Sequence, residues 1–98
     1  MSKTLGIFEV VLLAGIRRLG DQATGLNLRN ALAIKVNREI AVGQLYLSLG
    51  KLEQRGLITH RALKATPVKG GRTKKLFMLT ESGEHQLDET LAMLVDAP

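Results

Sequence analysis

Residues 42–58 read VGQLYLSLGKLEQRGLI, a leucine-patterned segment that reaches a glycine and then continues in apolar residues. Three of its leucines recur at i, i+4 and i+7, the spacing that places side chains on one face of an α-helix. These leucines are Leu45, Leu49 and Leu52. Gly56 is the residue type that often ends a helix, because it adopts a left-handed backbone without steric cost. The segment predicts an amphipathic helix over residues 42–55, capped by Gly56.

The stretch that follows this helix is basic. Residues 54–80 contain seven lysines and arginines and no carboxylate. Its apolar runs predict two strands, Leu57–Thr59 and Leu76–Leu79, and the turn-rich residues 66–71 predict the tip between them. A helix followed by a basic hairpin is the layout of a winged helix-turn-helix, in which the helix lies in the major groove and the hairpin follows the phosphates. We therefore expect double-stranded DNA as the partner.

Three further helices are predicted, over residues 4–19 with Thr4 as N-cap, over 24–36, and over 81–95 with Thr80 as N-cap. Ile40 is expected to pair briefly with the hairpin. The fold class is mainly α with a small β-hairpin wing. Residues 1–80 form the winged helix-turn-helix, and residues 81–98 form a C-terminal dimerisation helix of the same domain.

Two of these helices carry more apolar surface than one small body can cover. The first helix is apolar nearly all round, and the last has a leucine stripe but little body to pack on. We expect a homodimer, with packing within one chain as the alternative. The expected subunit contacts are Phe8, Val11, Leu12, Leu87, Leu91, Leu94 and Val95.

Composition narrows the class of protein. Ninety-eight residues make one domain, and the absence of cysteine excludes disulfides, thiolate zinc sites and a cysteine nucleophile. The net charge of +5 divides into +10 over residues 1–80 and −5 over residues 81–98. The apolar run at residues 10–16 is too short to span a bilayer and precedes its positive charges, the reverse of a signal peptide. We expect a cytoplasmic protein that binds a polyanion and no membrane.

Catalytic and metal chemistry find little support. His60 and His85 are far apart and lack a partner at metal-ligand spacing, so we interpret both as surface or rim histidines. The carboxylate pairs Glu81/Glu84 and Asp88/Glu89 lie on an acidic helix without a nucleophile or a phosphate-binding loop. We expect no enzyme activity, no metal and no cofactor.

Four stretches in order resemble the PadR family of bacterial transcriptional regulators: LGIFEVVLLA at residues 5–14, LGDQATG at 19–25, residues 43–58 with the steps Gly-x-Leu-Tyr and Leu-Glu-x-x-Gly-Leu, and residues 70–83. The resemblance implies a homodimeric winged helix-turn-helix repressor whose C-terminal helix packs on the partner's first helix. In several members a small hydrophobic or phenolic effector binds near that interface. This chain departs from the family pattern in having Ala41 where a Ser or Thr cap is usual, Thr24 where an aromatic is common, and no tryptophan.

The candidate DNA contacts lie on the outer face of residues 42–55 and in the hairpin. Gln44 can pair with adenine, Lys51 with guanine or phosphate, and Leu47 with a thymine methyl, whereas the alternative is an ordinary solvated face. Tyr46 resembles the family's tyrosine, expected at the sugar-phosphate backbone; half-buried packing is the alternative. Arg38 either clamps a phosphate or pairs with Glu39. The remaining candidates are Gly43 and Ser48 on the helix, and Lys64, Lys69, Arg72, Lys74 and Lys75 in the wing.

The wing cations suit phosphate oxygens, and Arg72 beside a Gly-Gly tip suits a minor groove. Lysines that face outward for solubility are the alternative. Two functions remain: a sequence-specific DNA-binding repressor that reads an inverted repeat as a homodimer, and a protein-interaction or effector-sensing module with weak DNA binding.

Overall fold

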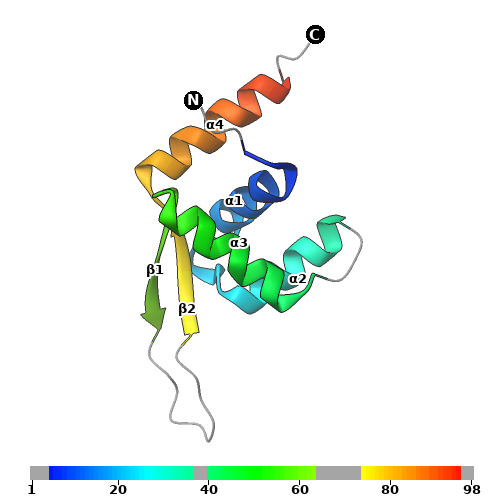
Figure 1. Ribbon diagram of the computed structural model, residues 1–98, viewed down its shortest axis with the longest axis vertical. Helices are drawn as coiled ribbons and strands as arrows, with labels where there is room; N and C mark the ends of the chain where they lie inside the picture. Colours follow the sequence, from blue (N-terminus) through cyan, green and yellow to red (C-terminus); the bar gives the residue numbers. More distant parts are fainter. Residues whose placement is uncertain (1–4, 37–39, 64–73, 96–98) are drawn as a thin grey trace, which may run out of the picture.

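The computed structural model describes residues 5–36, 40–63 and 74–95 (Figure 1). Within these residues it contains four α-helices, one 3₁₀ turn and one antiparallel hairpin, which confirms the predicted class. The elements in chain order are α1 (Ile7–Leu19), η1 (Gly20–Gln22), α2 (Gly25–Val36), α3 (Val42–Gln54), β1 (Ile58–Leu63), β2 (Lys74–Leu79) and α4 (Glu81–Val95). No helix of the described segments is both long and apolar enough to cross a membrane.

Helix α1 lies at the centre and packs against α2, β2 and α4. It contributes Leu12, Leu13 and Ile16 to a core that every helix and both strands share. The leucine stripe predicted for α3 faces this core, because Leu45, Leu49 and Leu52 are all buried. A central position explains why α1 is apolar on nearly all sides.

The start of α1 differs from the prediction. The helix begins at Ile7 with Gly6 as N-cap, so Thr4, which lies outside the described residues, is not its cap. Glu9 instead accepts a hydrogen bond from the Gly6 backbone N–H at 2.9 Å through one carboxylate oxygen. Its other oxygen binds the Arg55 guanidinium at 3.2 Å. One carboxylate thus stabilises the first turn of α1 and ties it to the end of α3.

Helix α3 ends in a Schellman motif one residue earlier than predicted. Arg55 is the C-cap, and Gly56 follows with a φ of 75°, a left-handed conformation that favours glycine. The Gly56 N–H donates to the Glu53 carbonyl at 3.0 Å, and the Leu57 N–H donates to the Leu52 carbonyl at 3.1 Å. At its other end α3 has Ala41 as N-cap and no side-chain capping bond, as expected.

The hairpin strands are longer than predicted. They pair from Ile58 opposite Leu79 to Leu63 opposite Lys74, so β1 extends beyond Thr59 and β2 begins before Leu76, at the two lysines. The predicted tip at residues 66–71 lies outside the described residues.

The expected pairing of Ile40 with the hairpin is wrong. Thr24 forms the isolated bridge to Leu76, and the Phe77 N–H donates to the Ala23 carbonyl at 2.9 Å. Ile40 is buried, and its carbonyl accepts from Arg29 Nε at 2.9 Å.

The predicted α4 is confirmed, with Thr80 as its cap. Thr80 Oγ1 accepts from the Gly83 N–H at 3.1 Å and donates to the Gly56 carbonyl at 2.6 Å. Gly83 is buried against the Leu57 carbonyl so closely that a Cβ there would overlap it. Arg17 on α1 then binds Glu84 at 2.8 Å and Asp88 at 2.9 Å. The start of α4 is therefore fixed both to the α3–β1 turn and to α1.

Candidate nucleic-acid interface

The outer face of α3 is exposed, as the leucine stripe predicts. Gln44, Leu47 and Lys51 all face solvent, and Leu47 is 60% exposed although it is a large apolar side chain. Ser48 is half-buried at the edge of this face. A Cβ placed on Gly43 would meet nothing within 4 Å, so packing within this chain does not require the glycine. The face offers amide, methyl and ammonium groups suited to base edges and phosphates.

Tyr46 lies beside this face and packs against α2. The phenol rests on Gly25, the first residue of α2, so closely that a Cβ at Gly25 would overlap the hydroxyl and the ring. The side chain is still 47% exposed. The packing alternative considered for Tyr46 is therefore present, and half of the side chain remains accessible. Sequence reasoning missed Gly25 as its partner, although glycine at the first turn of a helix is a signal of close approach.

The described part of the hairpin carries three exposed cations. Lys74 and Lys75 open β2, and Arg61, which sequence reasoning missed, lies on β1. Because Arg61 pairs with Leu76 and Ala62 with Lys75, side-chain alternation places Arg61 and Lys74 on one face and Lys75 on the other. Extending the predicted strand beyond Thr59 would have revealed Arg61. The other predicted cations, Arg38, Lys64, Lys69 and Arg72, lie outside the described residues.

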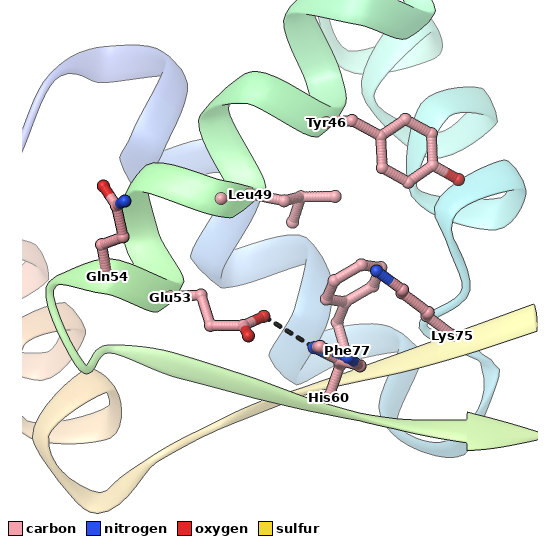
Figure 2. A pocket seen from close by; sticks show the side chains of 8 residues that line it. Tyr46, Leu49, Glu53, Gln54, His60, Lys75 and Phe77 are labelled. Carbon is pink, nitrogen blue, oxygen red and sulfur yellow. Dashed lines mark hydrogen bonds and ion pairs between the residues drawn. The ribbon is translucent and has the colours of Figure 1, made fainter.

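A shallow hollow of about 320 Å³ separates α3 from the hairpin (Figure 2). Its lining combines Tyr46, Leu49, Gly50, Glu53 and Gln54 of α3 with His60, Lys75 and Phe77 of the hairpin. Glu53 Oε1 and His60 Nδ1 meet across it at 2.7 Å. His60 is thus half-buried and paired within the groove, whereas His85 is an exposed histidine 3.4 Å from Glu89.

The predicted dimer contacts fall into three groups by exposure. Leu91, Leu94 and Val95 are 36%, 59% and 82% exposed on the last turns of α4. Phe8 and Val11 are partly buried against the core. Leu12 and Leu87 are wrong as subunit contacts, because both are 0% exposed inside the core of this chain. Ile7 and Met93, which are not among the predicted contacts, are also exposed, at 77% and 67%.

Two of the four acidic residues of α4, Glu84 and Asp88, have a structural role in the described chain. Arg17 holds Glu84 and Asp88, and its hydrogen bonds to these two carboxylates raise the pKa of the guanidinium further above its ordinary value. Across residues 5–36, 40–63 and 74–95, no group of three or more His, Asp or Glu side chains is placed to hold a metal ion.

Solved structures share this fold. In a complex structure, RosR of H. salinarum is 25% identical over 93% of this chain and 73% of its own, with a TM-score of 0.74. A PadR-like transcription factor from Bacteroides fragilis is 22% identical, with a TM-score of 0.76 over 93% of this chain and 82% of its own.

Bacillus subtilis PadR, solved in complex with operator DNA, is 24% identical, with a TM-score of 0.73 over 88% of this chain. This chain spans 48% of that protein. No curated protein matches the chain. The sequence profile of the transcriptional regulator PadR-like family matches residues 12–89, which include all of α2, α3 and the hairpin. The chain therefore belongs to the PadR-like family of transcriptional regulators, which are not enzymes.

Proposed function

We propose that this protein is a sequence-specific DNA-binding transcriptional regulator that acts as a repressor. The observation that carries the proposal is the exposed outer face of α3, with Gln44, Leu47 and Lys51, beside a hairpin whose strands carry Arg61, Lys74 and Lys75 and no carboxylate. A helix of this kind fits a major groove, and the hairpin cations suit the adjacent phosphates. The operator complex of the related B. subtilis PadR supports the proposal.

We further propose that the protein binds DNA as a homodimer through the last turns of α4. These turns expose Leu94 and Val95, and Ile7 at the start of α1 is another exposed apolar side chain. In Figure 1, the first turn of α4 adjoins the base of the hairpin, and its last turns lie at the far end of the molecule from the described part of the hairpin. Pairing at the α4 end therefore leaves α3 and the hairpin of each subunit accessible. A two-fold dimer then reads an inverted repeat with half-sites about one helical turn apart, about 34 Å.

In this arrangement the two regions have separate roles. Residues 1–80 read the DNA, and residues 81–98 pair the subunits, with the start of α4 held on its own subunit by Arg17. Two-fold symmetry brings the same apolar patch of each subunit together, so one exposed surface suffices for the interface.

The test is fluorescence anisotropy with the DNA upstream of this protein's own operon, compared with unrelated DNA over a range of salt concentrations. Gln44→Ala removes a proposed base contact and should reduce the preference for the upstream DNA. Lys75→Ala removes a proposed phosphate contact, so it should weaken binding to all sequences and lower the salt slope by about 1. If neither substitution changes binding, the interaction-module alternative replaces the repressor.

A further inference from the structure

Glu53 places a carboxylate in a groove whose surroundings are basic. It lies on the last turn of α3, one side of a hollow that Lys75 lines from β2. Figure 2 shows its carboxylate turned toward β1, where it meets His60, with the Phe77 ring beside the pair. The two side chains are 38% and 31% exposed. A carboxylate close to bound DNA would repel phosphates, so its partner on the hairpin indicates another role.

The backbone at this corner is already fixed. The Schellman motif determines how the chain leaves α3, and Thr80 Oγ1 donates to the Gly56 carbonyl within it. Further along, β2 is held on the body by the Phe77 N–H, which donates to the Ala23 carbonyl, and by the Thr24–Leu76 bridge. Neither of these contacts involves β1 or α3, and beyond the corner the Glu53–His60 contact ties β1 to α3. In the segments that the structure describes, it is the only side-chain hydrogen bond between α3 and the hairpin strands.

The hairpin transmits this restraint to its cations. His60 lies opposite Phe77, with ring centroids 5.9 Å apart, and the next pair on the same face is Ala62 with Lys75. Residues two apart on a strand are separated by about 7 Å. The contact that holds His60 therefore restrains the position of Lys75 relative to α3, in addition to the Thr24–Leu76 bridge that holds β2.

We propose that Glu53 and His60 are positioning residues for DNA recognition. They hold the hairpin at the angle to α3 at which Lys75 reaches a phosphate while Gln44 and Leu47 face base edges. This inference rests on the proposed DNA-binding function. Its consequence is specific: loss of the hydrogen bond lowers the preference for the correct site, because only that site needs base and phosphate contacts together.

Two substitutions of Glu53 separate positioning from charge. Glu53→Gln removes the negative charge but keeps an oxygen that accepts from His60, whereas Glu53→Ala removes both. In the anisotropy assay, Glu53→Ala should reduce the affinity ratio between upstream and unrelated DNA about fivefold, the effect of one hydrogen bond. Glu53→Gln should keep that ratio near the unsubstituted value. Equal ratios for the two variants would overturn the proposal, because charge alone would then explain the result.

His60 provides the reciprocal test, with His85 as its matched control. His60→Ala should lower the affinity ratio as Glu53→Ala does, and the double variant should lower it no further, since both remove the same contact. His85→Gln alters the exposed histidine near Glu89 and should leave the ratio unchanged. Thermal unfolding by circular dichroism shows whether each variant is folded. An additive double variant would count against the proposal.

A measurement without DNA keeps this inference separate from the proposed function. The chain has no cysteine, so spin labels can be placed by Lys51→Cys on α3 and Arg61→Cys on β1, both exposed positions. Double electron–electron resonance measures the distance between the two labels. Glu53→Ala should broaden the distribution of that distance, and Glu53→Gln should leave it narrow. An unchanged distribution in Glu53→Ala overturns the positioning role whatever the DNA result. If Glu53→Ala broadens the distribution but the protein shows no preference for the upstream DNA, the restraint is supported and only the proposed function is rejected.

Discussion

The leucine stripe of α4 runs through two halves of the helix that have different environments. The first half is held within its own chain, through the Thr80 cap, the buried Gly83 and Leu87, and the Arg17 ion pairs. The second half exposes Leu91, Met93, Leu94 and Val95. One continuous stripe thus lies in two environments. The difference shows that leucines at helical spacing can continue along a helix beyond the part that the neighbouring elements of its own chain cover.

The largest predicted effect comes from a substitution that disrupts the packing of the first half of α4. Gly83→Val places a Cβ against the Leu57 carbonyl, and backbone cannot move aside as a flexible side chain can. We expect a loss of about 3 kcal/mol or more in the free energy of unfolding. Urea denaturation measures this loss.

A matched glycine on α3 serves as the control for that substitution. A Cβ at Gly50 meets nothing within 4 Å, so Gly50→Ala should stabilise the protein by about 0.5–1 kcal/mol through helix propensity. A Gly83→Val protein as stable as the unsubstituted one would show that α4 does not need this close approach.

The second predicted effect comes from a substitution in the second half of α4, which should disrupt the proposed dimer surface without unfolding the subunit. Leu94→Asp puts a charge on the proposed dimer surface, where burial of a leucine contributes about 1.5–3 kcal/mol. Sedimentation should show a monomer at concentrations where the unsubstituted protein is a dimer. Helical content should persist, because Leu94 is 59% exposed in the single chain.

Ile34→Asp is the control for the dimer surface. Ile34 is an apolar side chain on α2 that is 82% exposed, and it should tolerate a charge without any change in assembly. If Ile34→Asp dissociates the dimer, or if Leu94→Asp does not, the dimer interface lies elsewhere.

A smaller effect is expected at the first turn of α4. Thr80→Ala removes the acceptor for the Gly83 N–H and the donor to the Gly56 carbonyl. We expect a loss of about 1 kcal/mol in the free energy of unfolding, a typical value for an N-cap. Thr80→Ser keeps both bonds and should lose much less. If the alanine and serine variants are equally stable, the cap contributes nothing to the first half of α4.

The sequence predicts the helices well where local signals agree. Residues 81–95 match α4 because Thr80 is a strong cap, and residues 42–55 match α3 to within one residue because Gly56 ends it. The hairpin was predicted too short because the charged residues of its outer halves hide strand alternation. Its register follows from pairing between segments that the turn brings together, which a local pattern does not encode.

Side-chain partners that depend on distant elements were the part of the site that sequence reasoning missed. Leu12 and Leu94 look alike in a helical pattern, yet one is buried in its own core and the other is exposed. Tyr46 and Gly25 lie on different elements, and so do Glu53 and His60. Their spacing along the chain therefore does not predict that they are in contact. The exposed face of α3 was predictable, because it lies on the side of the helix opposite the leucine stripe.

The smallest predicted effect tests the ion pairs that hold the first half of α4 on α1. Arg17→Met keeps much of the aliphatic side chain but removes the charge that binds Glu84 and Asp88. These groups are partly exposed, so we expect a loss of only about 0.5–1 kcal/mol in the free energy of unfolding. Thermal unfolding should show the loss at low salt and a smaller difference at 1 M NaCl, where the Debye length is about 3 Å.

The pKa of the Arg17 guanidinium is raised from an already high value, so the stability that Arg17 contributes is fully present below the ordinary arginine range and is lost only above it. The Arg17→Met difference should therefore stay constant between neutral pH and pH 9. A difference that disappears over that interval would assign the effect to another group and leave the capping and packing at Thr80 and Gly83 as what holds this half of the helix.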